Sequence, residues 1–159
     1  EHFIAWTNRF LQDWDGMRDM TETAGLSPEC PTLSGLRFVQ IDEFYPIDPT
    51  QHNSFNFYVK KFYIEGLGLD PARALLINSA DIPLYEGRKY TEVFPDHRVD
   101  LSLRYREAIS TFEEIQKQSI FMIDSWCADY ENRIRELGGI GFFLGGIGPD
   151  GQNQQFGTV

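Results

Sequence analysis

Basic residues and long hydrophobic runs are scarce in this chain. Its 14 lysines and arginines are outnumbered by 24 aspartates and glutamates, which gives a formal net charge of -10. Contacts to nucleic-acid phosphates or to anionic membranes need clustered Lys and Arg, so the composition argues against both partners. The apolar runs, such as 120–123, are far shorter than the ~20 residues that cross a bilayer.

Cysteine is also rare: Cys30 and Cys127 are the two present, and neither lies in a CxxC or Cys/His cluster. The sequence therefore predicts no zinc site and no disulfide framework. A reducing, cytoplasmic location is the expectation for such a chain, and no signal peptide is recognisable. Because residues 2–11 already read as the middle of a helix, we expect the sequence to be cut from a larger protein.

What is present suits one globular domain over residues 1–159, since 42% of the residues are hydrophobic and 14% are aromatic. Short apolar runs predict buried strands at 36–41, 73–78 and 140–144. Periodicity predicts helices at 1–20, 54–68 and 101–137, the last as one helix or as two that break near Ser119. This alternation indicates an α/β fold with an open, mostly parallel sheet flanked by helices, as in Rossmann-like proteins.

Local signals support these boundaries. Ser54 and Ser110 are expected helix caps, and Ser110 with Glu113 has the capping-box spacing. The first helix carries an aromatic stripe at helical spacing that we expect to cover a core. Residues 81–100 have no clear periodicity and read as a loop.

Acidic residues follow the first predicted strand and, after a glycine-rich turn, the third. Asp42 and Glu43 come directly after strand 36–41, and Asp150 lies in the loop after 140–144. Ligands of open α/β sheets bind outside the carboxyl ends of the strands, so we expect Asp42 and Asp150 to meet in one crevice. A positioned carboxylate there can abstract a proton next to a carbonyl. An aspartate after a strand can equally serve as a cap or turn residue.

The glycines of this loop, which include Gly145 and Gly146, can bring backbone N–H groups close to a phosphate or oxyanion. The stretch 146-GIGPDG-151 also meets the G-x-G-x-x-G spacing of dinucleotide sites. That motif normally follows the first strand of its unit and opens a helix, whereas this one follows the third and runs into Gln152 and further amides. Among the three histidines, His52 is the one close in sequence to a candidate site.

Three stretches, in order, carry a resemblance to a known family: 38-FVQIDEFYPI-47, 54-SFNFYVKKFY-63 and 127-CADYENRIRELGGIGFFLGGIGPDG-151. They resemble the glucosamine-6-phosphate deaminases (isomerases), which are related to the 6-phosphogluconolactonases. Phe44 after the acidic pair favours the deaminases, because the lactonases usually place Arg there.

The resemblance implies an enzyme that isomerises an amino sugar phosphate and releases ammonia, without a metal or organic cofactor. Asp42 matches the base that moves a proton between two carbons of the open-chain sugar, and Asp150 matches the acid that supports a ring-opening histidine. Gly145 and Gly146 match glycines of the sugar site. The resemblance also places Glu43 and Gln152 against the substrate.

Departures from the family pattern are equally specific. Gln152 stands where the family has its histidine, and an amide cannot act as a general acid or base. Residues 153–159 do not match the family's continuation, and 81–124 look like an insertion. The sequence therefore leaves three functions open: a deaminase, a non-catalytic module that binds sugar phosphates, and a lactonase-like hydrolase. A homo-oligomer is a further alternative that the sequence leaves open, in which an aromatic face such as that of Phe3, Trp6 and Phe10 packs on a partner.

Overall fold

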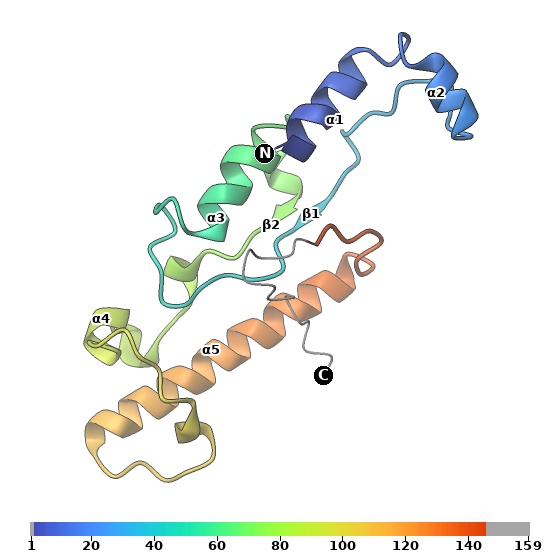
Figure 1. Ribbon diagram of the computed structural model, residues 1–159. Coiled ribbons are helices and arrows are strands. Elements are labelled where there is room, and N and C mark those ends of the chain that lie inside the picture. Colours follow the sequence, from blue (N-terminus) through green and yellow to red (C-terminus); the bar gives the residue numbers. More distant parts are fainter. Residues whose placement is uncertain (1, 146–159) are drawn as a thin grey trace.

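The computed structural model describes residues 2–145, in which helices surround one short pair of parallel strands (Figure 1). The α-helices are α1 (His2–Gln12), α2 (Arg18–Thr23), α3 (Phe55–Tyr58), α4 (Tyr90–Val93) and α5 (Thr111–Glu136). The strands are β1 (Phe38–Val39) and β2 (Ala74–Leu75). The π-helix η1 (Val59–Ile64) continues α3, and the 3-10 turns are η2 (Pro71–Arg73), η3 (Ser79–Asp81), η4 (Tyr85–Gly87) and η5 (Leu101–Arg104).

The two strands pair in parallel, with Phe38 opposite Ala74 and Val39 opposite Leu75. The helical segments α3 and η1 connect them, as a parallel pair requires. The backbone N–H of Gln40 extends the pairing by donating to the Leu75 carbonyl at 2.9 Å. The mixed α/β character expected from the sequence is therefore confirmed, although the regular strands are shorter than predicted.

The strand predicted at 140–144 is wrong. The residues from 139 to 145 form no strand, and the Phe142 side chain is 81% exposed. Gly138 and Gly139 leave α5 with φ angles of +94° and +83°, a conformation that favours glycine. An apolar run becomes a strand only when a neighbouring edge accepts its hydrogen bonds, and this segment lies across a groove from β1 instead of pairing with it.

The first predicted helix is divided in two, α1 and α2, by turns at residues 13–17. Trp14 lies in this turn, is buried, and donates its indole N–H to the Pro28 carbonyl at 3.2 Å. The expected aromatic face is only partly buried, because Phe3 and Trp6 are exposed and Ile4 packs inward instead. α1 contacts the end of η1, where the Asn8 amide donates to the Gly66 carbonyl at 2.6 Å.

The helix predicted at 54–68 begins as expected. Ser54 is its cap and accepts a hydrogen bond from the Phe57 N–H at 3.3 Å. The helix then widens into the π-helical η1, whose buried Val59 and Ile64 pack with Leu69 beside the strand pair. It ends in turns that include Gly66 and Gly68.

The last predicted helix is a single one, α5, and it begins at Thr111 rather than near 101. Ser110 caps it as expected, accepting from the Glu113 N–H at 3.1 Å, while the Glu113 carboxylate accepts from the Ile109 N–H. The alternative break near Ser119 is absent. This side chain is fully buried, and its hydroxyl oxygen accepts a hydrogen bond from the Tyr85 N–H at 3.2 Å.

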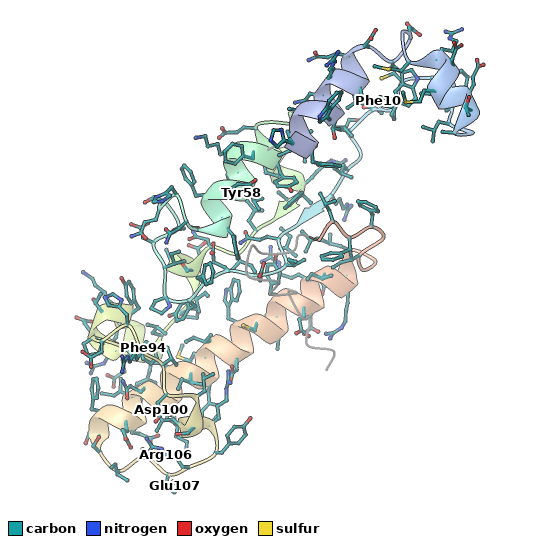
Figure 2. The ribbon with its side chains drawn as sticks, in the orientation of Figure 1. Phe10, Tyr58, Phe94, Asp100, Arg106 and Glu107 are labelled. Atoms are coloured by element: carbon teal, nitrogen blue, oxygen red, sulfur yellow. The ribbon has the colours of Figure 1, made fainter. Side chains whose placement is uncertain are left out.

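Residues 84–120 form a small lobe around the first half of α5 (Figure 1). The lobe includes most of the segment 81–100, which was predicted to be a loop. Its core consists of Leu84, Val93, Phe94, Leu103 and Ile120. Ion pairs lie at the border of this core: the Arg106 guanidinium lies 2.9 Å from the Asp100 carboxylate and 2.8 Å from that of Glu113. Figure 2 shows Asp100 and Arg106 in the same part of the molecule as the core residue Phe94. The description of residues 81–124 as an insertion stays a prediction.

Candidate functional site

A groove of about 940 Å³ lies along β1; we call it the β1 groove. Its lining comes from Phe3 and Thr7 of α1, from residues 33–42 around β1, from 52–69 around α3 and η1, and from the segment after α5. Most of the lining side chains are apolar, among them Phe38, Val39, Phe142 and Leu144. A groove of this size fits a small-molecule ligand, for which a few placed polar groups supply orientation.

Those polar groups gather beyond the carboxyl end of β1. Asp42, His52, Asn53 and Ser54 all line the β1 groove. Asp42 and Ser54 are brought together by Glu43, whose carboxylate accepts a hydrogen bond from the Ser54 hydroxyl at 2.8 Å. The carboxyl end of a parallel strand is where α/β proteins place their ligands, and here it carries the polar part of the groove.

Asp42 is half-buried at this position. Burial raises the pKa of its carboxyl, and the adjacent Glu43 carboxylate raises that pKa further. Both causes disfavour the charged form. A carboxylate with a raised pKa is a stronger base when ionised, which suits proton abstraction next to a carbonyl.

The backbone around Asp42 is fixed by the side chain of Gln40, which is buried at the end of β1. Its amide N–H₂ donates to the Asp42 carbonyl at 2.8 Å, and its amide oxygen accepts from the Ile77 N–H at 3.0 Å. Gln40 thereby ties the chain after β1 to the chain after β2. A polar residue near the end of an apolar run was a signal available in the sequence, and it was missed there.

Tyr130 of α5 fastens the helix to both strands. Its buried hydroxyl lies 2.6 Å from the Gln40 carbonyl oxygen and 2.8 Å from that of Leu75, so one proton is shared between two acceptors. The ring stacks on Trp126, with centroids 5.4 Å apart. The position of α5 relative to the β1 groove therefore depends on this contact.

Tyr130→Phe is expected to lower the free energy of unfolding by about 1–3 kcal/mol, because the buried Gln40 carbonyl loses this donor. Urea unfolding followed by circular dichroism measures the change. Tyr105→Phe is the matched control, since Tyr105 is 90% exposed, and it should leave the unfolding midpoint where it is. Equal midpoints for the two variants would contradict a stabilising role for the Tyr130 hydroxyl.

The structure describes some of the predicted site residues and not others. Asp42 lines the β1 groove, Glu43 lies behind it against α3, and Gly145 follows the groove-lining Leu144. Gly146, Asp150 and Gln152 lie outside the described residues, so the meeting of Asp42 with Asp150 stays a prediction.

Two further observations concern the residues from 2 to 145. No group of three or more His, Cys, Asp or Glu side chains in this range could hold a metal ion. None of the helices in the same range combines the length and apolarity needed to cross a membrane.

Comparison with known proteins gives short matches to one kind of enzyme. The chain is 42% identical over 45 residues to the glucosamine-6-phosphate deaminase of Phocaeicola vulgatus, which covers 24% of this chain and 17% of that protein. It is 34% identical over 71 residues to that of Borrelia hermsii, covering 35% of this chain and 27% of the relative. A 29-residue stretch is 59% identical to that of Bacteroides thetaiotaomicron, covering 18% and 11%.

These matches span about a quarter or less of the relatives' length and support a relationship to that family. No family model matches the chain, and no solved structure matches it significantly.

Proposed function

We propose that this protein acts on an amino sugar phosphate in the manner of a glucosamine-6-phosphate deaminase, with Asp42 as the proton-transfer base. The observation that carries the proposal is the position of Asp42: half-buried, beyond the carboxyl end of β1, and facing the β1 groove. The relatives named glucosamine-6-phosphate deaminase supply the substrate class.

In this reaction the Asp42 carboxylate takes the proton from C2 of the open-chain amino aldose and returns it to C1. The carbon–nitrogen bond at C2 becomes an imine, which water hydrolyses to the ketose and ammonia. A carboxylate whose pKa is raised toward the working pH is suited to both halves of the transfer. The charge that develops on O1 needs donors, which the loop of Gly145 and Gly146 is proposed to provide.

In the complete protein, we propose that β1 and β2 are neighbouring strands of a larger, Rossmann-like sheet and that Asp150 lies opposite Asp42. The expected location of the protein is the cytoplasm. Arg37 is the one lysine or arginine that lines the β1 groove among the described residues, so we propose it as a contact for the phosphate group.

A second function, binding of a sugar phosphate without turnover, is favoured by one observation. Gln152 is an uncharged amide at the position where the family has its ring-opening histidine.

The test is an ammonia-release assay on the full-length protein with glucosamine 6-phosphate, accompanied by its thermal unfolding with and without the same compound. Ammonia release supports the deaminase. A raised unfolding temperature without ammonia supports the binding module, because a ligand that binds only the folded state stabilises it. Hydrolysis of 6-phosphogluconolactone instead of either result would identify a lactonase.

A further inference from the structure

The carboxylate of Glu43 is fully occupied within the protein. Its Oε1 accepts from the N–H groups of Phe44 and Phe55 at 3.0 and 2.9 Å. Its Oε2 accepts from the Ser54 hydroxyl at 2.8 Å and from the Asn56 N–H at 2.7 Å. A carboxylate offers about four lone-pair sites, so these four donors leave none for a substrate hydroxyl.

The four donors come from both sides of a long loop. Phe44 is next to Glu43 in the chain, whereas Ser54, Phe55 and Asn56 form the start of α3. The buried Asn56 also donates its side-chain amide to the Ile77 carbonyl at 2.8 Å, beyond the end of β2. Glu43 therefore fixes the ends of the 44–53 loop, which carries His52 and Asn53 into the β1 groove.

This network holds the backbone on both sides of the Asp42 side chain. Gln40 holds the Asp42 carbonyl from the strand side, and Glu43 is anchored to α3 immediately after it. Asp42 lines the β1 groove and Glu43 does not. The two neighbouring acids thus have different surroundings, one turned to the groove and one turned to the protein.

We propose that Glu43 is a positioning residue, which holds the Asp42 carboxylate at the β1 groove and makes no contact with substrate. The inference rests on the proposed function, in which Asp42 is the base. A base displaced by about 1 Å can lose on the order of 100-fold in rate, so the anchoring of Glu43 should affect kcat far more than substrate binding.

Glu43→Gln tests this in the full-length protein. One side-chain oxygen becomes an N–H₂ that cannot accept from Ser54 or the backbone, so Asp42 loses its fixed position. The expected result is a kcat lower on the order of 100-fold, with KM for glucosamine 6-phosphate unchanged within about twofold. Glu65→Gln, at an exposed acid on the turn after η1, is the matched control and should behave as the wild type. A raised KM with an unchanged kcat would show that Glu43 binds substrate and would overturn the proposal.

The titration of Asp42 gives a second measurement that does not depend on activity. The charged or titratable side chains that line the β1 groove with Asp42 are Arg37, His52, Tyr58 and Tyr63, and Glu43 is adjacent. Removing the Glu43 charge should lower the pKa of Asp42, observable by NMR of ¹³C-labelled aspartate carboxyls. An unchanged Asp42 titration in Glu43→Gln would show that the Glu43 charge does not act on the Asp42 carboxyl.

Ser54→Ala changes position without changing charge, since it keeps both carboxylates and removes the hydroxyl that donates to Glu43 and caps α3. It should lower kcat less than Glu43→Gln does and leave the Asp42 titration unchanged. If Glu43→Gln does not fold, Ser54→Ala decides, and an unaltered kcat in it overturns the inference. If the wild type releases no ammonia, the proposed function fails, whereas ammonia release with an unaltered kcat in both Glu43→Gln and Ser54→Ala overturns the positioning role alone.

Discussion

Asp42→Asn is expected to reduce ammonia release from glucosamine 6-phosphate by about 100-fold or more, because general-base catalysis contributes about 10²–10⁴-fold and an amide cannot accept the proton. The amide has nearly the same shape, so binding of the sugar phosphate should persist. The measurement is kcat together with the ligand-induced rise in unfolding temperature. Asp19→Asn, at an exposed aspartate on α2, is the control.

Asp42→Asn should also differ from the wild type in how kcat depends on pH. In the wild type the base must be ionised, so kcat falls as pH falls through the pKa of Asp42. Burial and the Glu43 charge place that pKa above the ordinary 3.8 of an aspartate. The fall in kcat on the acid side of the pH profile, its acid limb, should therefore occur at a higher pH than for an ordinary aspartate. Any residual activity of Asp42→Asn should lack this limb. A variant that retains both the wild-type rate and the acid limb would assign the proton transfer to another residue.

Phe94→Ala should destabilise the small lobe by about 3–5 kcal/mol, the cost of truncating a phenylalanine in a packed core. Phe94 is 1% exposed and packs among Leu84, Val93, Leu103 and Ile120. Urea unfolding followed by far-ultraviolet circular dichroism measures the loss, since α5 supplies much of the helical signal. The control is Tyr105→Ala at a residue of the same lobe that is 90% exposed.

A loss below about 1 kcal/mol in Phe94→Ala would indicate that the lobe does not contribute a core of its own. A second unfolding transition, present in the wild type and shifted only in this variant, would instead show that the lobe unfolds independently. Either result would also bear on the role of residues 81–124 as an insertion.

The features that could be predicted from the sequence are the local ones. Ser54 and Ser110 cap helices because their hydroxyls accept from N–H groups three residues onward, a spacing that the sequence displays. The positions of β1 and β2 follow from short apolar runs, and Asp42 is one of the two acids that end the run of β1. These signals need no knowledge of distant residues.

The features that escaped prediction depend on distant partners. Ile140–Leu144 has a strand's composition, but pairing requires an edge that no local pattern specifies. The donors to Glu43 are up to 13 positions away in the chain, so its engagement with α3 could not be distinguished from contact with a ligand. Similarly, the aromatic stripe of α1 predicted a helix that covers a core, but the periodicity did not show which of its side chains are buried, and Ile4 is buried whereas Phe3 and Trp6 are exposed.

The continuity of α5 has a mechanical consequence. At 1.5 Å per residue, Ser119 in the small lobe and Tyr130 at the strands are separated by about 16 Å of unbroken helix. A rigid rod of this kind cannot be displaced at one end alone. Any molecule that shifts the small lobe must therefore either bend α5 or move Tyr130, and with it the Gln40 carbonyl next to Asp42. The shape of the β1 groove is in this way coupled to a part of the protein that does not line it.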